Sequence, residues 1–122
     1  MKLRFRQNSI RLRVNRREVQ GLATGDALTE QVHFPNNTEL AYVLQGASSE
    51  NPSVEFKAGV LRVEVPQPEL DKWASTDAIG MYFELPANGS FLKIAIEKDL
   101  ECIDGPMDER DPDAYPRSGK NC

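Results

Sequence analysis

The chain has 122 residues, of which 39% are hydrophobic and 28% charged, and a formal net charge of −4. This length and composition are those of one ordinary soluble domain over residues 1–122. They exclude a disordered tail protein, a collagen-like repeat and a membrane-spanning helix, which needs about 20 apolar residues in a row. The acidic balance argues against nucleic acid as the partner of the whole molecule.

The first predicted element is a hairpin in which apolar and basic residues alternate. The apolar residues occupy every second position, which is typical of half-buried strands: Leu3, Phe5, Ile10, Leu12 and Val14. Four arginines fill the other positions and share the opposite face: Arg4, Arg6, Arg11 and Arg13. Because this segment has no uninterrupted apolar run of about 7–15 residues, we expect no secretory signal and a cytoplasmic location.

A short helix and a second hairpin follow. Asn15 and Glu18 form a capping-box pattern that opens the helix. Its apolar stripe consists of Val19, Leu22 and Ala23. The next two strands are expected at about 27–34 and 39–45, joined by a turn rich in proline and asparagine.

The chain then repeats its own pattern at an offset of 51 residues. Residues 3–45 align with residues 54–96 without a gap, and nine of the 43 positions are identical. Turn and cap residues coincide as well as apolar ones, which favours an internal duplication. A fortuitous match of two similar strand and helix patterns is the alternative. Each copy is predicted as two strands, a helix and two strands, or ββαββ.

The predicted fold is therefore mostly-β α+β, with duplicated ββαββ halves, eight antiparallel strands and two short helices. Two helices of about nine residues cannot cover the apolar face of eight strands. The strands are expected to close into an eight-stranded antiparallel barrel, our first choice, or to fold into a two-layer sheet. Residues 46–53 form a linker, and an acidic coil is expected from about 101 to 122.

Several segments resemble a family of small bacterial proteins whose function is unknown. They are residues 1–4, 8–13 and 97–102, followed by Asp111, Asp113, Tyr115 and Pro116. The resemblance spans nearly the whole chain. It implies no activity, so that no catalytic residue can be transferred.

At the level of fold alone, the predicted barrel resembles the triphosphate tunnel enzymes. These enzymes also build an eight-stranded barrel from a duplicated unit, and their charged lumen binds triphosphate and metal. Their first strand carries alternating glutamates, where this chain has Arg4 and Arg6. The hallmark of that family is absent.

The arginine face needs compensation, because like charges on facing strand positions destabilise a sheet. Glu55 and Glu64 replace two of these arginines in the second copy and would pair with the face if the halves face each other. The alternatives are a bound anion, which suits the planar guanidinium group, and nucleic acid. The candidate anion-binding residues are Arg4, Arg6, Arg11, Arg13 and Arg62, which aligns with Arg11.

No catalytic residue, metal site or cofactor is predicted. His33, the single histidine, aligns with Glu84, which leaves an acid–base pair across the halves as an alternative. The carboxylates near the C-terminus do not follow EF-hand spacing, and the two cysteines fit no zinc motif. Trp73 and Tyr82 are expected in the core. The acidic coil is expected in solvent or docked on the basic first hairpin.

These observations predict a non-catalytic ligand- or partner-binding module with an arginine-rich face for a small anionic or phosphorylated ligand. The alternative is a phosphohydrolase-like enzyme that acts on a phosphorylated small molecule inside a charged barrel. That enzyme requires a lumen lined by the arginines and glutamates of both copies. A third hypothesis is a structural or assembly role, in which an exposed edge strand or an apolar patch pairs protomers. No membrane partner is expected, and the sequence predicts no oligomeric state.

Overall fold

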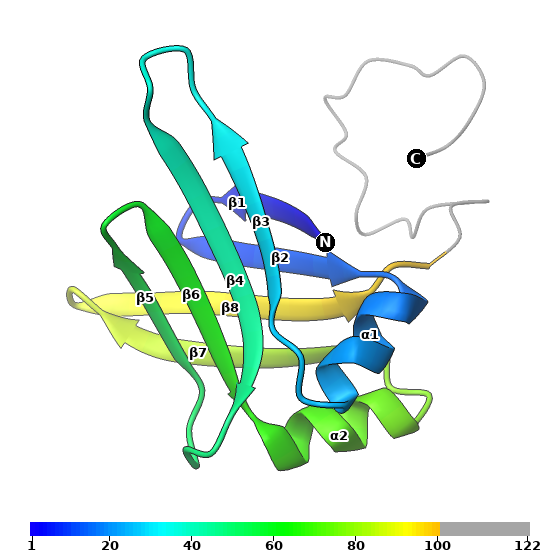
Figure 1. Ribbon diagram of the computed structural model, residues 1–122. Coiled ribbons are helices and arrows are strands. Elements are labelled where there is room, and N and C mark those ends of the chain that lie inside the picture. Colours follow the sequence, from blue (N-terminus) through cyan, green and yellow to red (C-terminus); the bar gives the residue numbers. More distant parts are fainter. Residues whose placement is uncertain (101–122) are drawn as a thin grey trace, which may run out of the picture.

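The computed structural model describes residues 1–100, which form eight strands and two helices (Figure 1). In chain order these are β1 (Lys2–Arg6), β2 (Ser9–Val14), α1 (Arg16–Ala23), β3 (Leu28–His33), β4 (Glu39–Ala47), β5 (Ser53–Lys57), β6 (Val60–Pro66), α2 (Gln67–Ser75), β7 (Gly80–Ala87) and β8 (Ser90–Lys98). The mostly-β α+β class and the two short helices are therefore confirmed. The predicted acidic coil from about residue 101 lies outside the described residues.

The eight strands are divided between two four-stranded sheets. The first sheet has the order β1-β2-β8-β7, and the second has the order β3-β4-β6-β5. Each sheet thus joins one hairpin from the first half of the chain to one hairpin from the second half. The two central pairs, β2–β8 and β4–β6, run parallel, whereas all other pairs are antiparallel. The predicted all-antiparallel arrangement is wrong at these two pairs, which join strands far apart in the sequence.

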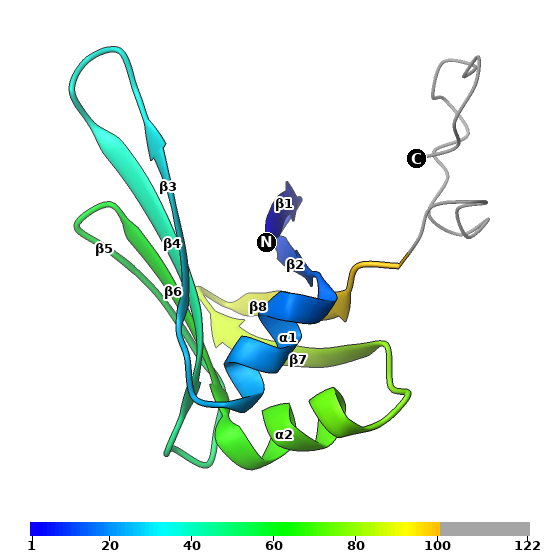
Figure 2. The ribbon, with the colours of Figure 1, turned by 45° about the vertical axis from the view of Figure 1, so that its right-hand side comes forward.

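The two sheets do not close into a barrel, so that our first choice of architecture is wrong. Figures 1 and 2 show the strands of the two sheets crossing, with both helices at one end. Helix α1 follows β2 and carries the chain from the first sheet to the second, and α2 returns it from β6 to β7. The helices pack on each other, α1 also contacts β3, and α2 contacts β4 and β6.

A single apolar core joins the inner faces of both sheets to the helices. Its fully buried side chains come from β2, β4, β6, β8 and both helices: Leu12, Val14, Leu22, Leu44, Val63, Val65, Leu70 and Ile96. Trp73 is also buried, as predicted, and its indole nitrogen donates to the carbonyl of Ile79 at 2.9 Å. The capping box of α1 is confirmed, because Asn15 and Glu18 exchange two hydrogen bonds of 2.9 Å.

The two halves correspond closely in their first hairpins and less closely in their second. Gln7 and Ala58 both have φ of 52° at the tight turns. Across the parallel pairs, however, Ser9 faces Lys93 and Val60 faces Ala41. If the offset of 51 held throughout, both members of these pairs would correspond at that spacing. Val60 does lie 51 residues after Ser9, but Lys93 lies 52 residues after Ala41, so the gapless alignment of the two halves ends before β4 and β8.

No helix within residues 1–100 is both long enough and apolar enough to cross a membrane.

Candidate functional site

The outer face of the first sheet is a regular grid of side chains. Successive residues of a strand point to opposite faces, so the register of the four strands places every second residue in a cross-strand row. In the order β1, β2, β8, β7 the rows are Lys2, Arg13, Glu97 and Gly80; then Arg4, Arg11, Ala95 and Tyr82; then Arg6, Ser9, Lys93 and Glu84. Charged residues from both ends of the sequence thereby become neighbours.

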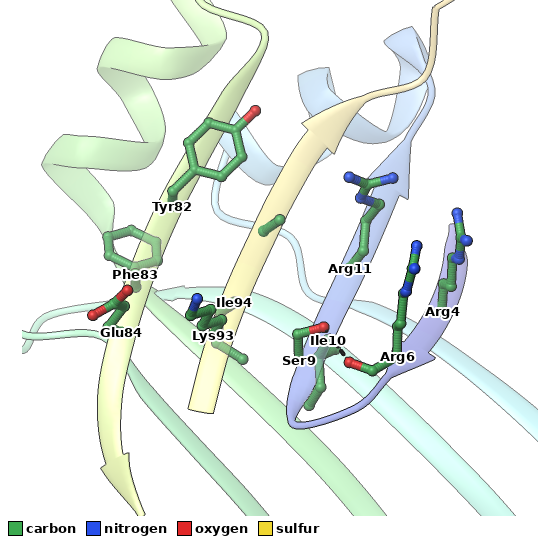
Figure 3. A pocket seen from close by; sticks show the side chains of 11 residues that line it. Arg4, Arg6, Ser9, Ile10, Arg11, Tyr82, Phe83, Glu84, Lys93 and Ile94 are labelled. Atoms are coloured by element: carbon green, nitrogen blue, oxygen red, sulfur yellow. Dashed lines mark hydrogen bonds between the residues drawn. The ribbon is translucent and has the colours of Figure 1, made fainter. Parts of the chain in front are cut away.

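The second and third rows line a groove of about 530 Å³, which we call the arginine groove (Figure 3). Its lining comprises Arg4, Arg6, Ser9, Ile10, Arg11, Tyr82, Phe83, Glu84, Lys93, Ile94 and Ala95. Small-molecule sites in proteins have volumes of about 300–1,000 Å³, so the groove can hold a ligand of that class. Ala95 leaves room between the two sides of the groove because its side chain is a single methyl group.

Three arginines form one side of the arginine groove. Arg4 lies directly opposite Arg11 across β1–β2, and Arg6 lies two residues along from Arg4 on the same face. Figure 3 shows their guanidinium groups on one side, Tyr82 and Glu84 on the other, and Lys93 between them. Within the described part of the chain, neither Arg4 nor Arg6 forms an ion pair. Both side chains are exposed, so this side of the groove presents unneutralised charge to solvent.

Arg11 and Arg13 are compensated by Glu97, a residue that sequence reasoning did not select. The Glu97 Oε1 atom lies 3.1 Å from Arg11 Nε and 3.8 Å from Arg13 Nε. Glu97 is only 9% exposed, and the two guanidinium groups offset the cost of burying its carboxylate. Its position among the outward-facing residues of β8 was only a weak indication that Glu97 would meet the arginines. The parallel pairing with β2 that brings it to the arginines cannot be read from local spacing.

Tyr82 is held on the surface rather than in the core, so that its predicted burial is wrong. The Tyr82 hydroxyl donates to Glu97 Oε2 at 2.7 Å, and the residue is 63% exposed. A Cβ atom on Gly80 would lie 2.6 Å from the Tyr82 hydroxyl oxygen and 2.7 Å from Cζ. The ring therefore lies over Gly80, where only glycine leaves it room, and its exposed face borders the arginine groove.

The five predicted anion-binding residues do not form one site. Arg4, Arg6 and Arg11 line the arginine groove, and Arg13 lies in the adjacent row. Arg62 lies on β6 in the second sheet, opposite Glu55 of β5. The alignment of Arg62 with Arg11 is therefore no guide to its position, because the two halves place their first hairpins in different sheets.

The charged lumen that the enzyme alternative requires is not formed by residues 1–100. The space between the sheets is filled by the apolar core, whereas the arginines of β1 and β2 lie on an outer face. Glu55 and Glu64 do not meet those arginines, since both lie in the second sheet, where Glu64 accepts a hydrogen bond from Gln45 at 2.8 Å. The expectation that they compensate the arginine face is wrong.

The other candidate groups are also separated. His33 Nδ1 lies 3.2 Å from Glu39 Oε2 in the second sheet, whereas Glu84 lines the arginine groove in the first. The His33–Glu84 pair is not formed. Among the first 100 residues, no group of three or more histidine, cysteine or acidic residues is placed to hold a metal ion. Both cysteines and the acidic residues near the C-terminus lie outside the described residues.

A separate polar cluster joins the start of the chain to the second sheet. The Met1 amino group lies 2.5 Å from Glu18 Oε2 and 3.6 Å from Glu30 Oε2. The Tyr42 hydroxyl donates to Glu30 Oε2 at 2.8 Å. Burial, this hydrogen bond and the nearby negative charges of Glu30 and Glu18 raise the pKa of Tyr42 to about 12. The cluster explains Glu30, which interrupts the apolar phase of β3.

One comparison with known proteins gives a match. The family model described as "Family of unknown function (DUF7009)" matches residues 1–119. No curated protein matches the chain, and no solved structure matches it. The match confirms the predicted relationship to an uncharacterised family. The bacterial origin of that family stays a prediction, whereas the likeness to the tunnel enzymes loses its basis because the strands of residues 1–100 form two sheets and no closed barrel.

Proposed function

We propose that this chain, which belongs to the family of unknown function DUF7009, is a non-catalytic binding module for a small anionic or phosphorylated ligand. The arginine groove is the proposed site. The observation that carries the proposal is the juxtaposition of Arg4 and Arg6 with Arg11 on one side of a groove of about 530 Å³.

The charges of the groove favour an anion. Among the described residues, four cationic side chains line it, namely Arg4, Arg6, Arg11 and Lys93, of which Arg11 is paired with Glu97 in the adjacent row, and Glu84 is the acidic residue of the lining. Like charges on directly opposed strand positions repel each other. A phosphate relieves this repulsion and accepts paired hydrogen bonds from the planar guanidinium forks.

The same groups favour binding over catalysis. A guanidinium group carries its positive charge at any physiological pH. Arg4, Arg6 and Arg11 can therefore hold an anion by charge and hydrogen bonds. General acid–base chemistry needs a group whose pKa lies near the working pH.

Two further proposals concern the origin and location of the chain. An internal duplication is supported by the repeated order of elements in residues 2–47 and 53–98 and by the equal φ of Gln7 and Ala58. The second proposal is a cytoplasmic location.

Calorimetric titration of the full chain with inorganic pyrophosphate at low salt tests the proposed function. We expect saturable binding that is weakened by loss of Arg4 and Arg6 and unaffected by the change Arg62→Ala. Absence of binding at millimolar pyrophosphate in low salt would contradict the proposal.

A further inference from the structure

We infer that the ligand of the arginine groove is a nucleoside phosphate, with its base on Tyr82 and its phosphate on the arginines. This inference rests on the proposed function and gives it a ligand class. It follows from the aromatic side of the groove, which plain anion binding does not use.

Tyr82 has the properties of a stacking platform. Its hydroxyl is held by Glu97 at 2.7 Å and its ring lies over Gly80, so that the ring keeps one position while 63% of the residue stays exposed. A ring held in place loses little freedom when a ligand binds. Stacking of a base on an aromatic side chain improves affinity about tenfold or more.

The spacing across the sheet suits a ligand with an aromatic end and an anionic end. Tyr82, Ala95, Arg11 and Arg4 form one row on four neighbouring strands. Strands lie about 4.8 Å apart, so the backbones of Tyr82 and Arg4 are separated by about 14 Å. Ala95 leaves the middle of the row hollow. A ribose can lie there when the base rests on Tyr82 and the phosphate reaches Arg11 and Arg4.

Glu84 supports the same ligand class. A carboxylate in a cationic groove weakens the binding of a simple phosphate, and Glu84 forms no ion pair within residues 1–100 although it faces Lys93. Glu84 lies two residues after Tyr82 on the same face of β7. Its oxygens can accept hydrogen bonds from the edge of a stacked base. Guanine suits this position best because two adjacent N–H groups of its edge can meet one carboxylate.

The test compares three probes by calorimetry on the full chain at low salt: guanosine monophosphate, ribose 5-phosphate and inorganic pyrophosphate. We expect guanosine monophosphate to bind about tenfold more tightly than ribose 5-phosphate. Equal affinities for these two probes would overturn the inference while leaving the proposed function intact, provided that pyrophosphate binds. If none of the three probes binds, both the inference and the proposed function fail.

Variants of the aromatic side make the test specific. Tyr82→Ala is expected to reduce the affinity for guanosine monophosphate several-fold, towards that for ribose 5-phosphate, and Tyr82→Phe is expected to retain most of it. Phe91→Ala is the matched control, because Phe91 is an exposed aromatic on the outer face of β8 that does not line the groove. An equal loss in Phe91→Ala, or no loss in Tyr82→Ala, would overturn the inference.

Replacing Glu84 is expected to change the affinities for pyrophosphate and for guanosine monophosphate in opposite directions. Glu84→Gln removes a negative charge, so the affinity for pyrophosphate is expected to rise. The affinity for guanosine monophosphate is expected to fall several-fold, because the amide presents one acceptor instead of two. A rise for both ligands would contradict the assigned contact with the base.

Discussion

Tyr82 and Glu97 are joined by a hydrogen bond of 2.7 Å between the tyrosine hydroxyl and the Oε2 atom of the carboxylate. The other oxygen of the same carboxylate faces Arg11 and Arg13. One nearly buried acidic residue therefore connects the aromatic side of the arginine groove to its cationic side. This connection underlies both the stability of the outer face and the geometry proposed for the ligand.

Replacing Glu97 by glutamine is expected to destabilise the fold. The change preserves shape but leaves Arg11 and Arg13 without this compensating charge, and we expect a loss of about 1–3 kcal/mol in the free energy of unfolding. Urea unfolding followed by circular dichroism measures it. Glu50→Gln, on an exposed loop, is the matched control and should be neutral. Equal stability of the two variants would show that Glu97 does not carry this role.

Gly80→Ala is expected to displace the Tyr82 ring. The new Cβ would lie 2.6 Å from the hydroxyl oxygen, so the exposed ring must move away and lose its hydrogen bond to Glu97, at a cost of about 0.5–1.5 kcal/mol. The cost should fall by about 0.5 kcal/mol or more when Tyr82 is alanine, because the clashing group is then gone. A double-mutant cycle by urea unfolding measures this coupling. Additive effects would mean that the ring does not rest on Gly80.

Anion binding is expected to weaken steeply with salt. The proposed contacts involve exposed charges, and the screening length falls from about 10 Å at 0.1 M salt to about 3 Å at 1 M. Titration of pyrophosphate in a sodium chloride series measures the slope. An affinity independent of salt would indicate that charge does not drive the binding.

Tyr42 is expected to make the stability of the fold depend on pH in the alkaline range. Its pKa is about 12 in the folded chain and 10.0 as a free side chain, so the folded state holds the phenolic proton more tightly. The resulting stabilisation is complete below pH 10 and is lost as the pH rises to about 12. Urea unfolding across this range should show a decline in the wild type that Tyr42→Phe lacks. Parallel curves would contradict the assignment.

Local features of this fold were predictable from the sequence. The alternation of the first hairpin placed Arg4, Arg6, Arg11 and Arg13 on one face, and the capping box located the start of α1. Both signals act over a few residues, which is the range in which strand and helix periods are decisive.

The features that were missed depend on contacts between distant segments. The parallel pairing of β2 with β8 brings Glu97 to Arg11, although 86 positions separate them in the sequence. Tyr82 is the exception, because it shares its phase of β7 with Glu84, whereas Met81 and Phe83 on the other phase pack in the core, so the local alternation already indicated the outer face. The repeat aligns Arg62 with Arg11, but an alignment cannot show that the two hairpins belong to different sheets.

The central claim is that Arg4 and Arg6 bind an anion in the arginine groove. The most direct measurement is calorimetric titration of pyrophosphate at low salt into the wild type, the double variant Arg4→Ala/Arg6→Ala and the control Arg16→Ala/Arg17→Ala. The control removes the same charge from exposed positions of α1 that do not line the groove. We expect the groove variant to lose about tenfold or more in affinity and the control to lose at most about twofold. Equal losses of affinity in the two double variants would contradict the claim, because the affinity would then depend only on the net charge of the chain and not on the groove.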